Sequence, residues 1–138
     1  MRTGTVLLVE DTPDDELLAL RALRRAEPDV AVEIVRDGQE AVDRLLDGDA
    51  LPDVAVLDLK LPKISGIDVI ARVRADARAR DVPIVVFSSS AEARDVAACY
   101  AAGANSYVQK PVDYRAFADA LVDIVRYWTR RNVSGDGG

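Results

Sequence analysis

The sequence predicts an α/β fold in which a parallel sheet of five strands is covered by helices on both faces. Short apolar runs alternate with longer amphipathic stretches five times along the 138 residues. The apolar runs are rich in valine, isoleucine and leucine, as is typical of strands buried on both faces of a parallel sheet. The connections are short, which favours right-handed βαβ crossovers within a single domain.

The expected strands follow from these apolar runs. The first, third and fourth runs are continuous, which indicates central strands. The second alternates between apolar and polar residues, so it is expected at an edge of the sheet. The fifth is short and is predicted by analogy with the other four. The five strands are expected at residues 5–9, 31–35, 54–57, 84–87 and 106–108.

Helix signals lie between the strands. A threonine–proline pair at 12–13 is typical of a helix start, and leucines 17, 20 and 23 predict the buried face of that helix. Ser65 and Asp68 have the spacing of a capping box, Gly103 is expected to end the fourth helix, and Asp113 to cap the last. The five helices are expected at 13–26, 38–46, 65–75, 92–102 and 114–128. The domain should span residues 1–131, with a disordered polar tail at 132–138.

The composition excludes several classes of function. The chain has no histidine and one cysteine, Cys99, which excludes histidine catalysis, an internal disulfide and a cysteine metal cluster. Any bound metal should be a hard cation with oxygen ligands, such as Mg²⁺. The 24 acidic and 18 basic residues give a net charge of −6, which disfavours nucleic-acid binding. The apolar runs are too short to span a membrane and the start lacks a signal peptide, so a cytoplasmic chain is expected.

Polar residues stand at the ends of four of the expected strands. Glu10 and Asp11 directly follow the first, Asp58 the third and Ser88 the fourth, and Lys110 follows the fifth after one intervening residue. The carboxyl ends of parallel strands meet at one edge of the sheet, where ligands bind in this class of fold. Clustered carboxylates repel one another unless a cation such as Mg²⁺ neutralises them. Asp58 is then a candidate nucleophile towards phosphorus, with Ser88 and Lys110 placed to contact phosphoryl oxygens.

This pattern resembles the receiver domain of two-component response regulators, from about residue 5 to residue 128. The resemblance is carried by Glu10-Asp11, Asp58 with Leu61-Pro62 and Gly66, Ser88, and Lys110-Pro111. It implies a flavodoxin-like (βα)₅ fold with strand order 2-1-3-4-5. It also implies a signalling domain rather than an enzyme, whose only reactions are its own phosphorylation and dephosphorylation.

The resemblance assigns a role to each site residue. Asp58 would accept phosphate from a kinase phosphohistidine, and Lys110 would pair with the phosphoryl group. Asp11 and Asp58 would bind Mg²⁺ directly, Glu10 through water, and the backbone carbonyl of Lys60 would be a further ligand. Ser88 and Tyr107 would form a switch pair that alters the face built by the fourth helix, fifth strand and fifth helix. The Lys110–Pro111 bond is expected to be cis.

A finer resemblance is to single-domain regulators of the phytochrome-associated type. It is carried by the segments VEDTPDD, VRDGQEA and DLKLPKISG and by Tyr127-Trp128. It implies a red-light-sensing histidine kinase as partner and a homodimer through the switching face. With no residues left for an output domain, the output is expected to be dimerisation, binding of another protein or onward phosphotransfer, without direct contact to nucleic acid or membrane.

Three other functions are weighed against this one. A phosphohydrolase would carry a second acid two residues after its nucleophile, where this chain has Lys60. A flavin or dinucleotide binder would need a glycine-rich loop after the first strand, and that loop is acidic and glycine-free. A pseudo-receiver that no longer takes phosphate would not be expected to keep the complete set of acids, serine and lysine. Lys60 also leaves the lifetime of the phosphoryl bond open.

Several of these residues also have purely structural interpretations. Glu10 and Asp11 are alternatively capping acids, and the acids at 14, 15 and 16 are expected to be a solvated first turn that the helix dipole favours. Tyr107 is alternatively a half-buried sheet residue, and Cys99 is expected to be a small buried helix residue. Trp128 belongs either to the core face of the last helix or to a partner interface.

Overall fold

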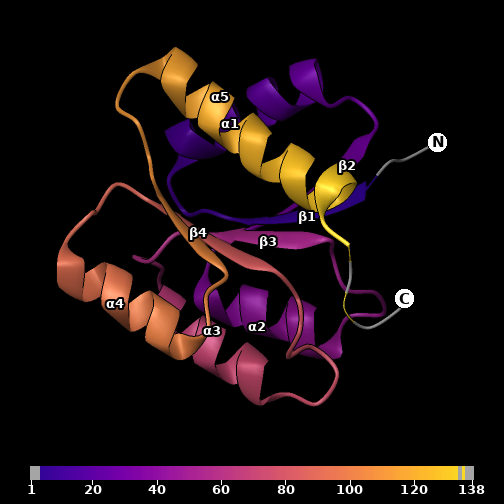
Figure 1. Cartoon of the computed structure of the whole chain (residues 1–138), viewed down its shortest axis with the longest axis vertical. Coiled ribbons are helices and arrows are strands. Elements are labelled where there is room, and N and C mark those ends of the chain that lie inside the picture. Colours follow the sequence, from indigo (N-terminus) through magenta and orange to yellow (C-terminus); the bar gives the residue numbers. More distant parts are fainter. Residues whose placement is uncertain (1–3, 134, 136–138) are drawn as a thin grey trace.

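The computed structural model describes residues 4–133 and 135, and it contains the predicted parallel sheet with helices on both faces (Figure 1). The strand order is β2-β1-β3-β4-β5, as the family resemblance implied, and every neighbouring pair is parallel. The strands are β1 (Gly4–Val9), β2 (Val30–Val35), β3 (Val54–Leu57), β4 (Ile84–Ser88) and β5 (Ser106–Gln109). The helices are α1 (Pro13–Ala26), α2 (Gly38–Asp47), α3 (Gly66–Ala75), α4 (Ala93–Ala102) and α5 (Tyr114–Arg126).

Two hydrophobic cores lie on opposite faces of the sheet. Helices α2, α3 and α4 cover one face, and α1 and α5 cover the other (Figure 1). Along β1, Leu7 and Val9 belong to the first core, whereas Val6 and Leu8 belong to the second. Successive side chains of a strand point to opposite faces, so a strand with a core on each side must be apolar throughout. Burial of the sheet on both faces therefore explains the uninterrupted apolar runs of the sequence.

Helix α1 buries only part of the face that was predicted. Its buried residues are Ala19, Ala22 and Leu23, whereas Leu17 is 55% exposed. The prediction followed the leucines because they are the most apolar residues of the segment. Small alanines instead form part of the second core, which α1 shares with α5. Within the described residues, no helix is long and apolar enough to cross a membrane.

The last helix ends earlier than predicted and continues as a π-helical turn, η1 (Tyr127–Arg131). In this region Glu27, at the end of α1, is almost fully buried and forms ion pairs with Arg126 at 3.0 Å and Arg130 at 2.9 Å. A 3.6-residue periodicity gives no sign of such a turn, which is why the sequence predicted a regular helix to residue 128. Trp128 packs partly buried against the second core. Of the predicted disordered tail, residues 134 and 136–138 lie outside the described residues.

Gly38 is expected to tolerate no side chain. It starts α2 and its N–H donates to the carbonyl of Pro62 at 3.1 Å, and a Cβ there would overlap the backbone carbonyl of Ile64. Gly38→Ala should therefore lower the free energy of unfolding in urea by about 1–3 kcal/mol, as overpacking does. The matched control is Gln39→Ala at the next, exposed position, with an expected change within about 0.5 kcal/mol. Equal unfolding midpoints for the two variants would contradict this prediction.

Candidate functional site

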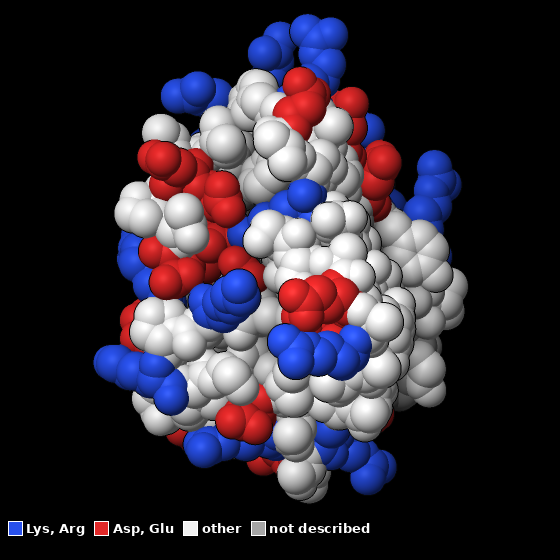
Figure 2. All heavy atoms as spheres, turned by 90° about the vertical axis from the view of Figure 1, so that its left-hand side faces the viewer, with Lys and Arg blue, Asp and Glu red and all other residues white. Residues whose placement is uncertain are grey.

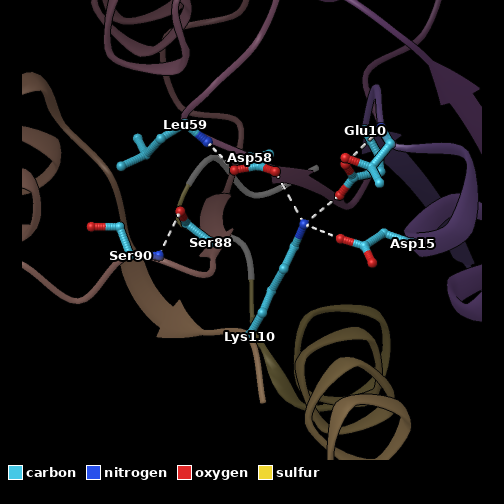
Figure 3. A network of polar contacts seen from close by, with 8 residues as sticks. Glu10, Asp15, Asp58, Leu59, Ser88, Ser90 and Lys110 are labelled. Atoms are coloured by element: carbon cyan, nitrogen blue, oxygen red, sulfur yellow. Dashed lines mark hydrogen bonds and ion pairs between the residues drawn. The ribbon is translucent and has the colours of Figure 1, made fainter. Parts of the chain in front are cut away.

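The ends of four strands bring the predicted polar residues together. Strands β1 and β3 end side by side, since Val9 pairs with Leu57, and the N–H of Asp58 donates to the carbonyl of Val9 at 3.2 Å. Glu10 follows β1 directly, and Lys110 follows β5. Acidic side chains gather on the face of the molecule that Figure 2 shows, which is the left-hand side of Figure 1. Figure 3 shows the side chain of Lys110 pointing toward the carboxylates of Glu10, Asp15 and Asp58.

The ammonium group of Lys110 is the centre of this network. Its Nζ lies 2.6 Å from Glu10 Oε2, 2.8 Å from Asp15 Oδ2 and 3.0 Å from Asp58 Oδ2. Since an ammonium has three N–H donors, all of them are used (Figure 3). Burial by itself lowers the pKa of Lys110, but the hydrogen bonds to Asp15 and Glu10 and the charge of Asp58 outweigh it, so the pKa is raised. Lys110 therefore carries a full positive charge in the site.

Glu10 is the most deeply buried acid of the site, with its side chain 5% exposed. Burial raises its pKa, and the opposing contacts with Lys110 and with the N–H of Thr12 at 3.1 Å only partly offset this. Asp11, the next residue, is exposed. The alternative interpretation of Glu10 as a capping acid fits only one of its two contacts, because its other oxygen accepts from Lys110.

Three acids of the site have the arrangement that a hard cation requires. Glu10, Asp11 and Asp58 each offer a carboxylate oxygen, and these oxygens lie within 4.8 Å of one another. Ligand oxygens about 2.1 Å from an octahedral Mg²⁺ lie roughly 3–4 Å apart, so small side-chain movements would suffice to seat the ion. The donor set is all oxygen and strongly anionic, as Mg²⁺ prefers. These residues therefore fit the metal that the sequence predicted.

Asp58 is held by its own loop. Its Oδ1 accepts from the N–H of Leu59 at 2.7 Å, and its side chain is 13% exposed. The loop passes so close to α3 that a Cβ on Gly66 would lie 2.6 Å from the backbone carbonyl oxygen of Asp58. Glycine at this position lets the helix start against the site. Lys60, two residues after Asp58, is exposed.

Comparison with known proteins shows the family to which this chain belongs. Residues 6–122 match the family described as the response regulator receiver domain. This chain belongs to that family. Receiver domains are signalling domains of two-component systems, and they bind Mg²⁺ at the acidic site.

Several relatives of this receiver domain match it over most of their own length. It is 34% identical to the probable methanogenesis regulatory protein FilR2 of Methanothrix harundinacea, covering 94% of this chain and 86% of that protein. The structure of the phosphorylated cyanobacterial phytochrome response regulator RcpA superimposes with a TM-score of 0.87 at 30% identity, covering 94% of this chain and 96% of that one. The bacteriophytochrome response regulator RtBRR is 40% identical with a TM-score of 0.74, covering 99% and 86%.

The predicted switch residues of the receiver domain meet at the loop between β4 and α4. Ser88 is buried, and its Oγ accepts from the N–H of Ser90 at 3.3 Å (Figure 3). Tyr107 is partly buried on β5, and its hydroxyl donates to the carbonyl of Ser90 at 2.8 Å. Ser90 thus links the two residues. Its own hydroxyl donates to Asp95 in the first turn of α4 at 2.7 Å.

Two expectations about the receiver domain are wrong. Asp15 was expected to be a solvated acid in the first turn of α1, but it contacts Lys110. The Lys110–Pro111 bond was expected to be cis, and no peptide bond among the described residues is cis. The trans form is intrinsically favoured even before proline.

Proposed function

We propose that this receiver domain accepts a phosphoryl group on Asp58 from the phosphohistidine of a sensor histidine kinase. The observation that carries the proposal is the position of the Asp58 carboxylate between two kinds of positive partner. On one side it shares a cluster with Glu10 and Asp11 that fits Mg²⁺. On the other it lies 3.0 Å from the ammonium of Lys110. When a carboxylate in this position attacks phosphorus, the metal and the ammonium can neutralise the charge of the phosphoryl group from two sides.

In the proposed reaction, a carboxylate oxygen of Asp58 forms a bond to phosphorus as the phosphorus–nitrogen bond to the kinase histidine breaks. The electron pair of that bond returns to the imidazole ring. Lys110 holds an equatorial phosphoryl oxygen, and the Ser88 hydroxyl donates to another. Bound Mg²⁺ would supply charge neutralisation, held by Glu10, Asp11 and Asp58 with the Lys60 carbonyl as a further ligand. Hydrolysis of the aspartyl phosphate would return the domain to its resting state.

The output is proposed to pass through the face formed by α4, β5 and α5. A phosphoryl group on Asp58 would draw the Ser88 hydroxyl away from Ser90, whose carbonyl is the acceptor for Tyr107. Phosphorylation would then shift the equilibrium between two arrangements of the loop between β4 and α4. Homodimerisation or the binding of another protein at this face would report the change.

A phytochrome-type kinase is proposed as the partner. Support comes from the likeness to RcpA and RtBRR, both named as phytochrome or bacteriophytochrome response regulators. The name of FilR2 points to a different input, so the kinase has to be tested directly. The chain should accept phosphate from a phosphorylated bacteriophytochrome kinase faster than from a kinase with an unrelated sensor.

The proposal is tested by the intact mass of the purified chain after incubation with acetyl phosphate. A single phosphoryl adduct is expected with Mg²⁺ and none with EDTA. Borohydride reduction, which converts an acyl phosphate to an alcohol, should then mark the peptide that contains Asp58. Sizing chromatography of the same samples reports on dimerisation. An unmodified mass after both acetyl phosphate and a phosphorylated kinase would overturn the proposal and favour a pseudo-receiver.

A further inference from the structure

We propose that Asp15 is a positioning residue that keeps the ammonium of Lys110 in the site when its other carboxylate partners are taken by metal and phosphate. The inference rests on the proposed phosphorylation of Asp58. Asp15 belongs to the first turn of α1, and its Oδ2 lies 2.8 Å from Lys110 Nζ, a shorter distance than that from Asp58. Figure 3 shows it approaching Lys110 from the side of α1.

All three N–H groups of Lys110 are engaged in the site. Each of its three N–H groups has one carboxylate partner, and the side chain is only 7% exposed. Two of these partners, Glu10 and Asp58, also belong to the cluster that fits Mg²⁺. Asp15 does not belong to that cluster. Its side chain is 30% exposed, so it also remains partly hydrated.

Metal binding and phosphorylation act on two of the three partners. A carboxylate of the metal cluster shares its charge with the cation, and phosphorylation of Asp58 replaces its carboxylate charge with that of the phosphoryl oxygens. Asp15 alone of the three belongs neither to the metal cluster nor to the phosphorylated group, so its charge stays available to Lys110. One N–H then stays fixed on Asp15 while the other two are free to turn to phosphoryl oxygens.

The same contact should assist metal binding before phosphorylation. Asp15 neutralises part of the Lys110 charge and so weakens its hold on Glu10 and Asp58. Without Asp15 the ammonium would rely on those two carboxylates alone and compete with Mg²⁺ for them. Loss of Asp15 should therefore lower both the Mg²⁺ affinity and the rate of phosphorylation.

The test compares Asp15→Asn with Asp14→Asn, a matched change of charge at the neighbouring exposed position of the same helix turn. For Asp15→Asn we expect the Mg²⁺ dissociation constant, measured by calorimetry without a phosphoryl donor, to rise about tenfold, the scale of one partly exposed charge-assisted hydrogen bond. The maximal phosphorylation rate with acetyl phosphate at saturating Mg²⁺ should fall by a similar factor, with its KM unchanged. Asp15→Glu, which restores the charge, should recover part of both effects, whereas Asp14→Asn should resemble the wild type.

The outcomes separate this inference from the proposed function. If the wild type is phosphorylated and Asp15→Asn matches Asp14→Asn in Mg²⁺ affinity and rate, the inference alone is wrong. If the wild type takes no phosphoryl group, the proposed function fails, and the positioning role of Asp15 for a phosphoryl group fails with it. An Asp15→Glu variant as impaired as Asp15→Asn would also count against a role for charge.

Discussion

Asp58→Asn is expected to abolish the phosphoryl adduct while the chain stays folded. The amide has nearly the shape of the carboxylate, and its oxygen can still accept the N–H of Leu59, which now bonds Asp58 at 2.7 Å. It lacks the anionic oxygen that would attack phosphorus. The substitution also removes one of the three carboxylates that fit Mg²⁺, so the Mg²⁺ affinity should fall as well.

The measurement is the intact mass after incubation with acetyl phosphate and Mg²⁺. The matched control is Asp53→Asn, at the opposite end of β3, where the carboxylate is exposed and accepts the N–H of Thr5 at 2.8 Å. The control should be phosphorylated as fully as the wild type. An adduct of equal yield on Asp58→Asn would move the acceptor to another residue, and borohydride reduction would identify it.

Much of the site was predictable because the topology leaves little freedom. A strand with a core on each face appears in the sequence as an unbroken apolar run, so the first polar residue after it marks the carboxyl end of the strand. In a parallel sheet all such ends meet at one edge. Glu10 and Asp58 were found in this way, and Lys110 by its place just beyond the short fifth strand. The structure brings the Lys110 ammonium within hydrogen-bonding distance of both acids.

The sequence could not give the same information about Asp15. Acids in the first turn of a helix are favoured by the helix dipole alone, so their presence does not indicate a site. The partner of Asp15 lies 95 residues away, and no local pattern encodes that contact. The burial of Leu17 was wrongly predicted for a related reason. Large residues dominate an apolar periodicity, whereas the small residues Ala19 and Ala22 of α1 are the ones buried in the second core.

Lys110→Met is expected to be the most destabilising change in the site. The side chain of Glu10 is buried, and its Oε2 lies 2.6 Å from the Lys110 ammonium that offsets its charge. Methionine preserves much of the length of the side chain but leaves Glu10 and Asp58 without their cation. Removing one partner of a buried ion pair costs about 3–5 kcal/mol. The variant should also be phosphorylated far more slowly, because no ammonium remains to hold a phosphoryl oxygen.

Urea unfolding with and without Mg²⁺ separates this electrostatic cause from a packing defect. Added Mg²⁺ can neutralise the acids that have lost Lys110, so it should stabilise Lys110→Met more than it stabilises the wild type. The matched control is Lys63→Met, where the lysine is 66% exposed and pairs with Asp37 at 3.4 Å, and the expected loss is at most about 1 kcal/mol. If Mg²⁺ stabilises both variants and the wild type equally, the lysine is held by packing rather than by charge. Lys110 would then not be the counter-ion on which the acidic cluster depends.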